Sequence, residues 1–540
     1  MELSPSAHVD TFCRDNLPAA TLWPAMSFEL PELNYPERLN CATALLDDIV
    51  ATHGADRPCL LSPGETWTYG RLLARSNQIA GYLADERGLV PGQRVLLRGP
   101  NNPWLVACWF GVLKAGGVVV ATVPLLRAAE LRPLIGLTQC SLVLCDHRFA
   151  ADMTAVVADA GIALVLYGGD GEDDLVASSA TKPATFTNVD TAADDVALLA
   201  PTSGTTGSPK ATMHFHRDVL AIADTFGKHI VRGVTDDVFA GTPPLAFTFG
   251  LGGLVIFPLR IGASTLLLER ATPVELAEAV ERFRATVLCT APTAYRAILR
   301  AGREASLRSL RRAVSAGEHL PQQVWEEFHA KTTIKLIDGI GSTEMLHVFI
   351  SAADDDIRPG ATGRAVPGYQ AAVFDQDGQP APDGTPGRLG VRGPTGCRYL
   401  ADNRQTTYVQ DGWNMTGDTY IRDADGYFWY QARSDDMVIS SGYNIAAPEV
   451  EWALEQHPDV VECAVVGQPD IERGMVVHAV VVLRENVTGD AAKIVELQAF
   501  AKEAIAPYKY PRSIEFVAAL PRTTTGKLQR FRLRQRQAAQ

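Results

Sequence analysis

The first 300 residues of the chain alternate between helical and strand-like hydrophobic patterns. The stretch 67–85 carries leucine and isoleucine at the spacing of one helix face, which predicts a helix there. Short apolar runs between such stretches predict strands. The alternation continues through a predicted helix at 104–114 and predicted strands at 94–98, 118–123, 141–145, 163–167, 196–199, 265–268 and 287–289. Strands interleaved with helices in this way favour α/β layers built on largely parallel sheets.

The pattern changes after about residue 360. Glycine and proline are frequent between residues 360 and 396, and short β-like runs at 371–374 and 389–392 predict a smaller β subdomain. From Asp436 onward a compact α+β pattern follows. It consists of predicted helices at 448–457 and 491–506 and predicted strands at 460–466 and 476–483.

We expect a domain boundary where polar residues separate two apolar runs. The tetrad 433–436 has this position, which predicts a large N-terminal domain, 1–434, and a small C-terminal domain, 435–540. At about 100–200 residues per domain, a chain of 540 residues has room for both. The predicted fold class is α/β: a large domain of layered α/β sheets with a β subdomain, followed by a small α+β domain.

Composition and charge exclude several classes of protein. Hydrophobic residues make up 46% of the chain and charged residues 21%, as in ordinary globular proteins. A net charge of −13 argues against a broad surface for nucleic acid or anionic membrane. The nine cysteines are scattered and never spaced C-x-x-C, which disfavours a disulfide framework or a cysteine zinc site. No signal peptide and no apolar run of about 20 residues is visible, so we expect a cytoplasmic protein.

The first segment that carries chemistry is a loop rich in hydroxyl residues and glycine that follows an apolar strand. Glycines let backbone N–H groups approach phosphate oxygens, hydroxyls donate hydrogen bonds, and a lysine adds charge. The loop is not a Walker A motif, because Ser208 and Pro209 separate its last glycine from the lysine. It predicts a phosphate-binding loop, with a plain surface connection as the alternative. Its residues are Thr202, Ser203, Gly204, Thr205, Thr206, Gly207 and Lys210.

Three further segments place charged side chains on glycine-containing loops. The run 338–344 ends in Thr343-Glu344, and a hydroxyl beside a carboxylate suits a phosphate and Mg²⁺. The alternative there is a turn that caps a following helix, with Ser342 or Thr343 as the N-cap. Asp418 follows Gly417 and suits a ribose diol, although such a pair also forms simple turns. The third loop, 521–527, ends in Lys527, where the alternative is a solvated surface lysine.

Together and in this order, these segments resemble the adenylate-forming superfamily of acyl- and aryl-CoA synthetases, firefly luciferase and nonribosomal adenylation domains. The resemblance covers nearly the whole chain and includes the runs 113–117 and 315–318. It implies an enzyme that joins a carboxylate to ATP, releases pyrophosphate, and passes the acyl group from acyl-AMP to a thiol. The implied cofactors and cosubstrates are ATP, Mg²⁺ and CoA.

The resemblance also implies roles for single residues. The loop 202–210 would hold the β- and γ-phosphates, Thr343 would contact the α-phosphate and Glu344 would bind Mg²⁺. Lys527 would bridge the carboxylate and the α-phosphate, where its charge stabilises the transition state. Asp418, assisted by Arg433, would bind the ribose hydroxyls. The adenine slot would be lined by Ser315, Ala316, Gly317, Glu318, Asp338 and Gly339.

The same resemblance implies a small C-terminal domain that rotates between two half-reactions. Asp435 would be the hinge, and the CoA tunnel would be formed by Ser441, Gly442 and Tyr443. Gly442 would lie where the thiol passes, because a side chain there would block it. Asn444 departs from the residue that is common in the superfamily and marks a subgroup.

The acid itself is predicted from an aromatic segment and from local resemblances. Phe247 and Phe249 would enclose a flat ring and His347 would supply a polar contact, unless the two phenylalanines simply pack in the core. The expected pocket residues are Phe247, Thr248, Phe249, Gly341, His347 and Val348. The run 339–347 resembles benzoate–CoA ligases, and the runs 28–40 and 441–451 resemble 2-aminobenzoate–CoA ligases.

These resemblances favour an aryl acid, with 2-aminobenzoate before benzoate. The run 427–435 is also similar to medium-chain acyl-CoA synthetases, so a medium-chain fatty acid comes third. Two other functions stay open: an enzyme that loads an aryl acid onto a carrier protein, and a non-catalytic nucleotide-binding relative. Lys210, Glu344, Asp418 and Lys527 argue against the last.

Overall fold

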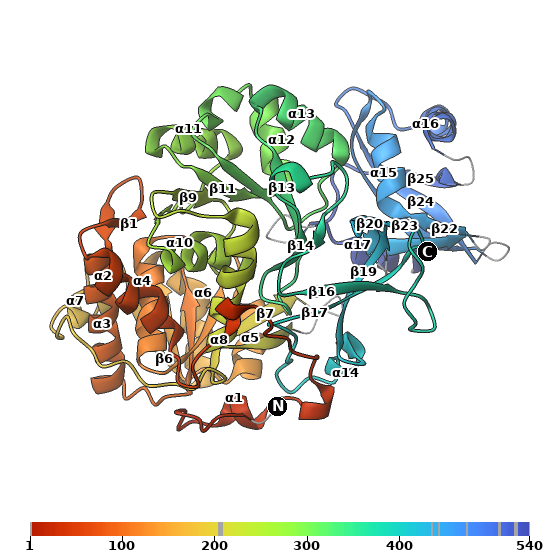
Figure 1. Ribbon diagram of the computed structural model, residues 1–540. Helices are drawn as coiled ribbons and strands as arrows, with labels where there is room; N and C mark the ends of the chain where they lie inside the picture. The colour runs from red at the N-terminus through yellow and green to blue at the C-terminus, as the bar shows by residue number, and fades with distance from the viewer. Residues whose placement is uncertain are drawn as a thin grey trace. The chain divides into compact units, whose positions relative to one another are not determined.

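A computed structural model describes residues 3–203, 209–433, 436–440, 443–470, 474–505, 509–522 and 528–538 (Figure 1). The chain divides into two compact units. The first comprises Met1–Ala371, Gly390–Met415 and Gly426–Phe428. The second comprises Ala372–Leu389, Thr416–Asp425 and Trp429–Gln540.

One layer of the first unit is a mostly parallel sheet with the strand order β6-β5-β3-β4-β7-β8. β8 runs antiparallel to β7, whereas the other neighbours are parallel. The strands are β3 (Arg94–Arg98), β4 (Val118–Thr122), β5 (Leu142–Asp146), β6 (Ala163–Tyr167), β7 (Val196–Ser203) and β8 (Pro209–Phe215). Their central valines and leucines are buried on both faces, as is usual for parallel sheets between helices.

Helices cover this sheet on both sides. α5 (Ala128–Thr138) and α6 (Ala150–Ala160) pack leucine, valine and methionine side chains against one face. α4 (Pro103–Lys114) contacts β3 and β4 and is buried along its whole length, and α3 (Tyr69–Asp85) packs on α4. The side chains of Thr68 and Asn102 accept backbone N–H groups at the starts of α3 and α4, which fixes where these helices begin.

A second sheet of the first unit has the strand order β15-β14-β13-β12-β11-β9-β10-β1-β2. The neighbours from β13 to β1 are parallel, and β14, β15 and β2 are antiparallel to their neighbours. The strands are β1 (Pro58–Leu61), β2 (Thr66–Thr68), β9 (Val238–Gly241), β10 (Ser264–Leu266), β11 (Val287–Thr290), β12 (Arg312–Ser315), β13 (Leu336–Gly341), β14 (Val348–Ser351) and β15 (Arg364–Ala365). Three helices bury one face of it, α11 (Pro273–Phe283), α12 (Pro292–Arg300) and α13 (Gln322–Thr332).

Shorter elements complete the first unit. The helices are α1 (Phe12–Asp15), α2 (Asp48–His53), α7 (Leu175–Ser179), α8 (His216–Ile222), α9 (Thr248–Leu251), α10 (Phe257–Arg260) and α14 (Gln405–Tyr408). π-helical segments occupy Thr43–Asp47, Ala223–Val231 and Gly252–Ile256. A further sheet, in which several strands run through the boundary between the units, has the order β16-β17-β19-β18 with β20 beside β19. Its strands are β16 (Gln370–Phe374), β17 (Gly387–Arg392), β18 (Val409–Gln410), β19 (Trp413–Arg422) and β20 (Phe428–Arg433).

The second unit has its own sheet and its own core. The strand order is β22-β21-β24-β23, with β25 parallel to β24. Its strands are β21 (Met437–Ser440), β22 (Tyr443–Ala446), β23 (Val460–Asp470), β24 (Gly474–Leu483) and β25 (Ser513–Phe516). α15 (Ala447–Glu455) and α16 (Ala491–Ala504) bury apolar side chains on one face, and α17 (Arg530–Ala538) packs Leu533 against another cluster of the same strands.

The predicted α/β fold class is confirmed. The predicted helices and strands are present in the described residues, with ends that differ by a few positions. All nine cysteines lie in the described part of the chain, where they are buried free thiols. In that same part, no helix is long and apolar enough to cross a membrane.

Candidate functional site

The phosphate loop of the sequence analysis lies between two strands at the edge of the first sheet. The antiparallel register of β7 and β8 places Lys210 opposite Thr202, and Pro209 opposite Ser203. The hydroxyl of Thr202 is buried and has no hydrogen-bond partner among the described residues. An unpaired buried hydroxyl next to a lysine fits a site for phosphate oxygens. Gly204, Thr205, Thr206 and Gly207 lie outside the described residues.

The segment after β13 forms a tight connection into β14. The backbone N–H of Leu346 donates to the Thr343 carbonyl at 3.1 Å, and that of Met345 donates to the Ser342 hydroxyl at 3.2 Å. A Cβ atom at Gly341 would lie 2.7 Å from the His347 carbonyl oxygen, so this connection requires glycine there. Because β14 returns directly along β13, no helix follows, and the alternative in which Ser342 or Thr343 caps a helix is wrong.

Glu344 lies in a small cluster with a lysine and a tyrosine from other parts of the first unit. The ammonium of Lys210 donates to Glu344 Oε1 at 2.7 Å and also donates to the Tyr399 hydroxyl. The Tyr399 hydroxyl donates to the same Glu344 oxygen at 2.5 Å. Lys210 Nζ lies 4.3 Å from the centre of the Tyr399 ring, a favourable position for a cation. Lys210 belongs to β8, and a β-bridge between Thr212 of the same strand and Tyr399 places the tyrosine beside the lysine.

The charges of this cluster follow from burial and pairing. Burial opposes ionisation of Glu344, but the charge of Lys210 and the hydrogen bonds from Lys210 and Tyr399 outweigh it and lower its pKa. Burial, followed by the nearby Glu344 charge, raises the pKa of Tyr399 and keeps its hydroxyl protonated. The cluster therefore presents an ionised carboxylate and a cationic lysine. A carboxylate oxygen suits Mg²⁺ and an ammonium suits phosphate, so these residues fit MgATP.

The predicted adenine slot follows from the pairing of two parallel strands. Ser315 ends β12 and pairs with Asp338 of β13. The Ser315 hydroxyl is fully buried and has no partner among the described residues. Burial raises the pKa of Asp338 well above its usual range. The structure thus brings Ser315 and Asp338 together.

The other expected slot residues adjoin these two. Ala316 is buried, Gly317 has a φ of +92°, which favours glycine, and Glu318 is exposed. Gly339 follows Asp338 on β13, and a Cβ atom there would lie 2.8 Å from Val348 Cγ1. Four of the six predicted residues therefore lie at the end of β12 or directly after it, and the other two lie within β13.

His347, which is expected in the acyl pocket, is buried among three phenylalanine rings. Its ring centroid lies 5.3 Å from that of Phe226, 5.7 Å from Phe249 and 4.6 Å from Phe257. A Cβ atom at Gly252 would lie 2.3 Å from His347 Cδ2, so glycine makes room for the ring. Burial lowers the pKa of His347 to about 3, and a backbone hydrogen bond with Phe249 opposes this only in part. The ring is neutral at physiological pH.

The remaining pocket residues have different surroundings. Phe249 and Thr248 belong to α9, where Phe249 packs on His347. Phe247 precedes α9 and is 38% exposed, so it is not a core residue. Val348 is buried at the start of β14. Phe226 and Phe257 were not predicted for this pocket, because they lie about 90 to 120 residues before His347 in chain segments that carry no motif.

Two predicted ribose-binding residues meet within the second unit. Arg433 Nη1 lies 3.1 Å from Asp418 Oδ1 and also donates to the Thr416 carbonyl at 3.4 Å. Gly417, which lies between Thr416 and Asp418, has a φ of +78°, and a Cβ atom there would lie 3.0 Å from Arg433 Nη2. Tyr443 begins β22 opposite Ser440. Asp435, Ser441, Gly442 and Lys527 lie outside the described residues.

Comparison with known proteins decides the family. A family model described as AMP-binding enzyme matches residues 46–399. The chain belongs to the AMP-binding enzymes. A second model, the AMP-binding enzyme C-terminal domain, matches residues 449–527.

Relatives of this AMP-binding enzyme match along nearly their whole length. The benzoate–CoA ligase of Thauera aromatica is 34% identical over 513 residues, 93% of this chain and 97% of that protein. The 3-hydroxybenzoate–CoA ligase of Aromatoleum sp. (strain CIB) is 32% identical over 512 residues, 92% of this chain and 97% of that protein. The crystal structure of the anthranilate CoA ligase AuaEII with anthranoyl-AMP has a TM-score of 0.87 at 32% identity, and covers 94% of this chain and 99% of that one. The predicted adenylate-forming fold and acid–thiol ligase class are confirmed.

Sequence reasoning missed three residues that support the site of this AMP-binding enzyme. Tyr399 contacts Glu344 as described above, and His214 of β8 lies with Nε2 2.8 Å from the Thr343 carbonyl oxygen. Burial lowers the pKa of His214 to about 4, so its ring is neutral. Arg398 pairs with Asp218 at 2.7 Å, and both side chains are fully buried. The sequence signal that could have found His214 is its position four residues after Lys210 on one strand.

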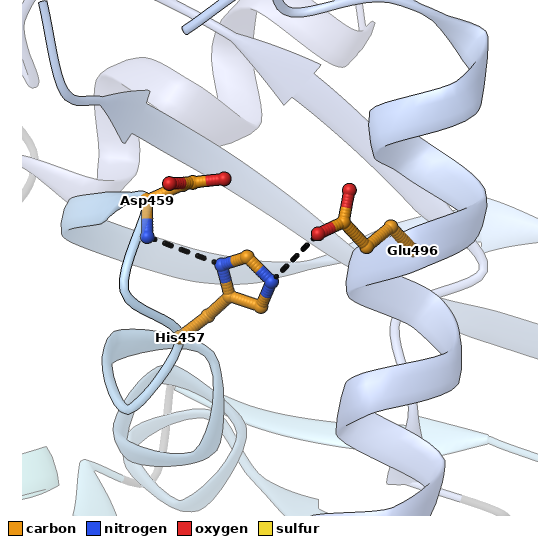
Figure 2. A group of neighbouring side chains, drawn as sticks. All are labelled: His457, Asp459 and Glu496. Carbon is orange, nitrogen blue, oxygen red and sulfur yellow. Dashed lines mark hydrogen bonds and ion pairs between the residues drawn. The ribbon is translucent and has the colours of Figure 1, made fainter.

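One group of side chains in the second unit has the spacing of metal ligands, within the ranges that the structure describes. Figure 2 shows that His457 faces Glu496, with His457 Nε2 3.1 Å from Glu496 Oε1, and that Asp459 lies beside them. The Lys493 ammonium lies 2.7 Å from an Asp459 oxygen and 2.6 Å from a Glu496 oxygen. Because the Lys493 ammonium already pairs with both carboxylates, this group is an ion-pair cluster.

Proposed function

We propose that this AMP-binding enzyme is an aryl–CoA ligase. It activates an aromatic carboxylic acid, 2-aminobenzoate before benzoate, as the acyl-AMP, and it transfers the acyl group to CoA with release of AMP and pyrophosphate. The observation that carries the proposal is the connection between β13 and β14. Its first half holds Thr343 and the paired Glu344, and its second half holds His347 among aromatic rings. One short segment thus joins a site for MgATP to a pocket for a flat acid.

The residues at the first half of this segment bind and orient MgATP. Glu344 is ionised and would hold Mg²⁺, which offsets the repulsion between carboxylate and triphosphate when it is bound. Lys210 would exchange its Glu344 partner for the β- and γ-phosphates, together with the hydroxyls and N–H groups of residues 202–207. Thr343 would contact the α-phosphate. Ser315, Asp338 and their neighbours 316–318 and 339 would hold the adenine.

The residues at the second half orient the acid. His347 is neutral and, among the described residues, neither ring nitrogen makes a hydrogen bond of normal geometry to a side chain. A neutral imidazole can donate or accept one hydrogen bond, which suits an amino or hydroxyl group on the ring of the acid. The similarity to a benzoate–CoA ligase, a 3-hydroxybenzoate–CoA ligase and an anthranilate CoA ligase supports an aryl acid.

The C-terminal residues complete the proposal. Asp435 is the hinge at the start of a small C-terminal domain, 435–540, which follows a large domain, 1–434. Lys527 acts in adenylation. Ser441, Gly442 and Tyr443 line the CoA tunnel. Asp418 and Arg433 bind the ribose. The match of the C-terminal family model to residues 449–527 supports this division of labour, because Lys527 ends the match. A cytoplasmic location stays a prediction.

A panel of carboxylic acids with ATP, Mg²⁺ and CoA tests the function. We expect AMP and pyrophosphate to form with 2-aminobenzoate and benzoate. Smaller amounts are expected with hydroxybenzoates, and very small amounts with hexanoate. A preference for hexanoate would favour the medium-chain alternative. Formation of aryl-AMP without any transfer to CoA would favour a carrier-protein acceptor. Absence of pyrophosphate release with every acid would contradict the proposal.

The same panel with His347→Phe tests the pocket. This variant keeps an aromatic ring but removes the polar nitrogens, so we expect it to reduce the preference for 2-aminobenzoate over benzoate. Phe328→Leu, a substitution of a buried core residue on α13, is the control. An unchanged preference would contradict the contact between His347 and the ring substituent.

A further inference from the structure

The Thr343–Glu344 segment is held by two side chains of the same strand. Lys210 and His214 both belong to β8 and are four residues apart. Side chains alternate between the faces of a strand, so residues i and i+4 lie on one face. Lys210 Nζ lies 2.7 Å from Glu344 Oε1, and His214 Nε2 lies 2.8 Å from the Thr343 carbonyl oxygen. One edge strand therefore contacts the side chain of one residue and the backbone of its neighbour.

The hydrogen bond from His214 has a defined direction. A carbonyl oxygen accepts and never donates, so Nε2 carries the proton and His214 is the donor. Nδ1 then carries a lone pair, and it has no hydrogen-bond partner among the described residues. The Asp218 carboxylate lies 4.0 Å from Nδ1 and is paired with Arg398. Arg398 thus neutralises Asp218 without any need for a proton on Nδ1.

The Thr343 carbonyl has a second donor, the N–H of Leu346, which closes the turn. Leu346 has a φ of +67°, a conformation that a leucine adopts only when its surroundings hold it there. Loss of the His214 donor would leave this turn with its internal hydrogen bond alone. The side chains of Thr343 and Glu344 would then be less firmly placed.

We propose that His214 is a positioning residue for MgATP binding: it holds the Thr343 carbonyl, and through it the side chains of Thr343 and Glu344. This inference rests on the proposed function of those two residues. In this role His214 affects MgATP binding through Thr343 and Glu344 and does not contact the nucleotide itself. It also explains why a histidine is placed inside a strand between two buried apolar residues, Met213 and Phe215.

The test compares two substitutions at this position in the full-length enzyme. His214→Gln places an amide N–H near the position of Nε2, whereas His214→Met has similar volume and no donor. A net hydrogen bond contributes about 0.5–1.5 kcal/mol, or about two- to tenfold. We expect Met to raise the Mg²⁺ concentration for half-maximal adenylation by about that factor, and Gln to stay within about twofold of wild type.

The matched control removes a histidine–carbonyl hydrogen bond elsewhere in the same unit. His329 Nδ1 lies 3.3 Å from the Ile334 carbonyl oxygen, at the end of α13. His329→Met is expected to leave the Mg²⁺ dependence unchanged. If His214→Met does not fold, His214→Gln is compared with His214→Asn. The asparagine amide lies near the position of the histidine Nδ1 and does not reach the Thr343 carbonyl.

Three results would overturn the inference. The first is an equal Mg²⁺ dependence of adenylation in the His214→Gln and His214→Met variants. The second is a shift in the His329→Met control as large as that in His214→Met. The third is a His214→Met variant that loses maximal rate without any change in its Mg²⁺ dependence. Failure of the proposed function is distinguishable, because the wild-type enzyme would then release no pyrophosphate with any acid. In that case calorimetric binding of MgATP replaces the adenylation assay, and the same order of variants is expected.

Discussion

The charged residues proposed for the two units are held in different ways. In the first unit Lys210, Glu344, Asp218 and Arg398 are buried or nearly so, and partners from distant parts of the chain meet them. In the second unit Arg433 pairs with Asp418, which lies 15 residues before it, and the arginine side chain is 45% exposed. Burial strengthens an ion pair and makes an unpaired charge costly, whereas solvent weakens an exposed pair.

This difference predicts two kinds of variant. Substitutions at the buried pairs of the first unit change stability and nucleotide binding together, because the same contacts serve both. Substitution of the exposed Arg433 in the second unit should leave stability almost unchanged.

The largest effect is expected where a buried charge loses its partner. Asp218→Asn leaves the Arg398 guanidinium without a carboxylate inside the first unit, where it lies over Phe215 at 4.0 Å. We expect the free energy of unfolding to fall by about 3–5 kcal/mol, measured by urea denaturation. Asp159→Asn is the control, because Asp159 pairs with Arg132 on the surface. Equal losses in the two variants would remove the contrast between buried and exposed pairs.

The next effect concerns one half-reaction. Lys527→Ala removes the charge proposed to stabilise the adenylation transition state, so we expect adenylation to fall by about 10²–10³-fold. Thioester formation from supplied aryl-AMP should continue, and the melting temperature should not change. Pyrophosphate release and thioester formation are measured separately. Equal loss of both steps would contradict the assigned role.

Local sequence patterns predicted the elements of both units well, because each pattern reports on neighbouring residues. The helix 67–85 and the strand 94–98 correspond to α3 and β3, since their apolar spacing is set by local geometry. Thr343 and Glu344 were found because they adjoin in a glycine-rich run. Ser315 and Asp338 were expected in one slot only through the family resemblance, and the register of β12 and β13 now shows that they are paired.

The contacts between distant residues could not be predicted from such patterns. Tyr399 reaches Glu344, 55 residues away, through a bridge to Thr212, and His214 reaches Thr343 across 129 residues. The aromatic rings around His347 come from separate segments near residues 226, 249 and 257. Strand order and register decide these contacts, and a single sequence carries no local signal for them.

A smaller effect is expected for the second half-reaction. Gly442→Leu adds a side chain where the thiol of CoA is proposed to pass. Overpacking of this kind costs about 1–3 kcal/mol, so thioester formation should slow by about tenfold or more. The rate of adenylation, measured as pyrophosphate release, should stay near that of the wild-type enzyme. Gly171→Ala is the control, because that glycine has no positive φ and nothing lies within 4 Å of a Cβ atom there. An unchanged CoA reaction in the Leu variant would remove Gly442 from the tunnel.

The smallest effect is expected at the exposed pair of the second unit. Arg433→Gln removes the charge beside Asp418 but keeps a donor for the Thr416 carbonyl. Because solvent already screens this arginine, the free energy of unfolding should change by less than about 1 kcal/mol. The KM for ATP should rise a few-fold if Asp418 needs Arg433 to face the ribose, while the maximal rate of adenylation stays the same. A loss of stability as large as that of Asp218→Asn would show that the second unit, like the first, depends on its charged pairs to fold.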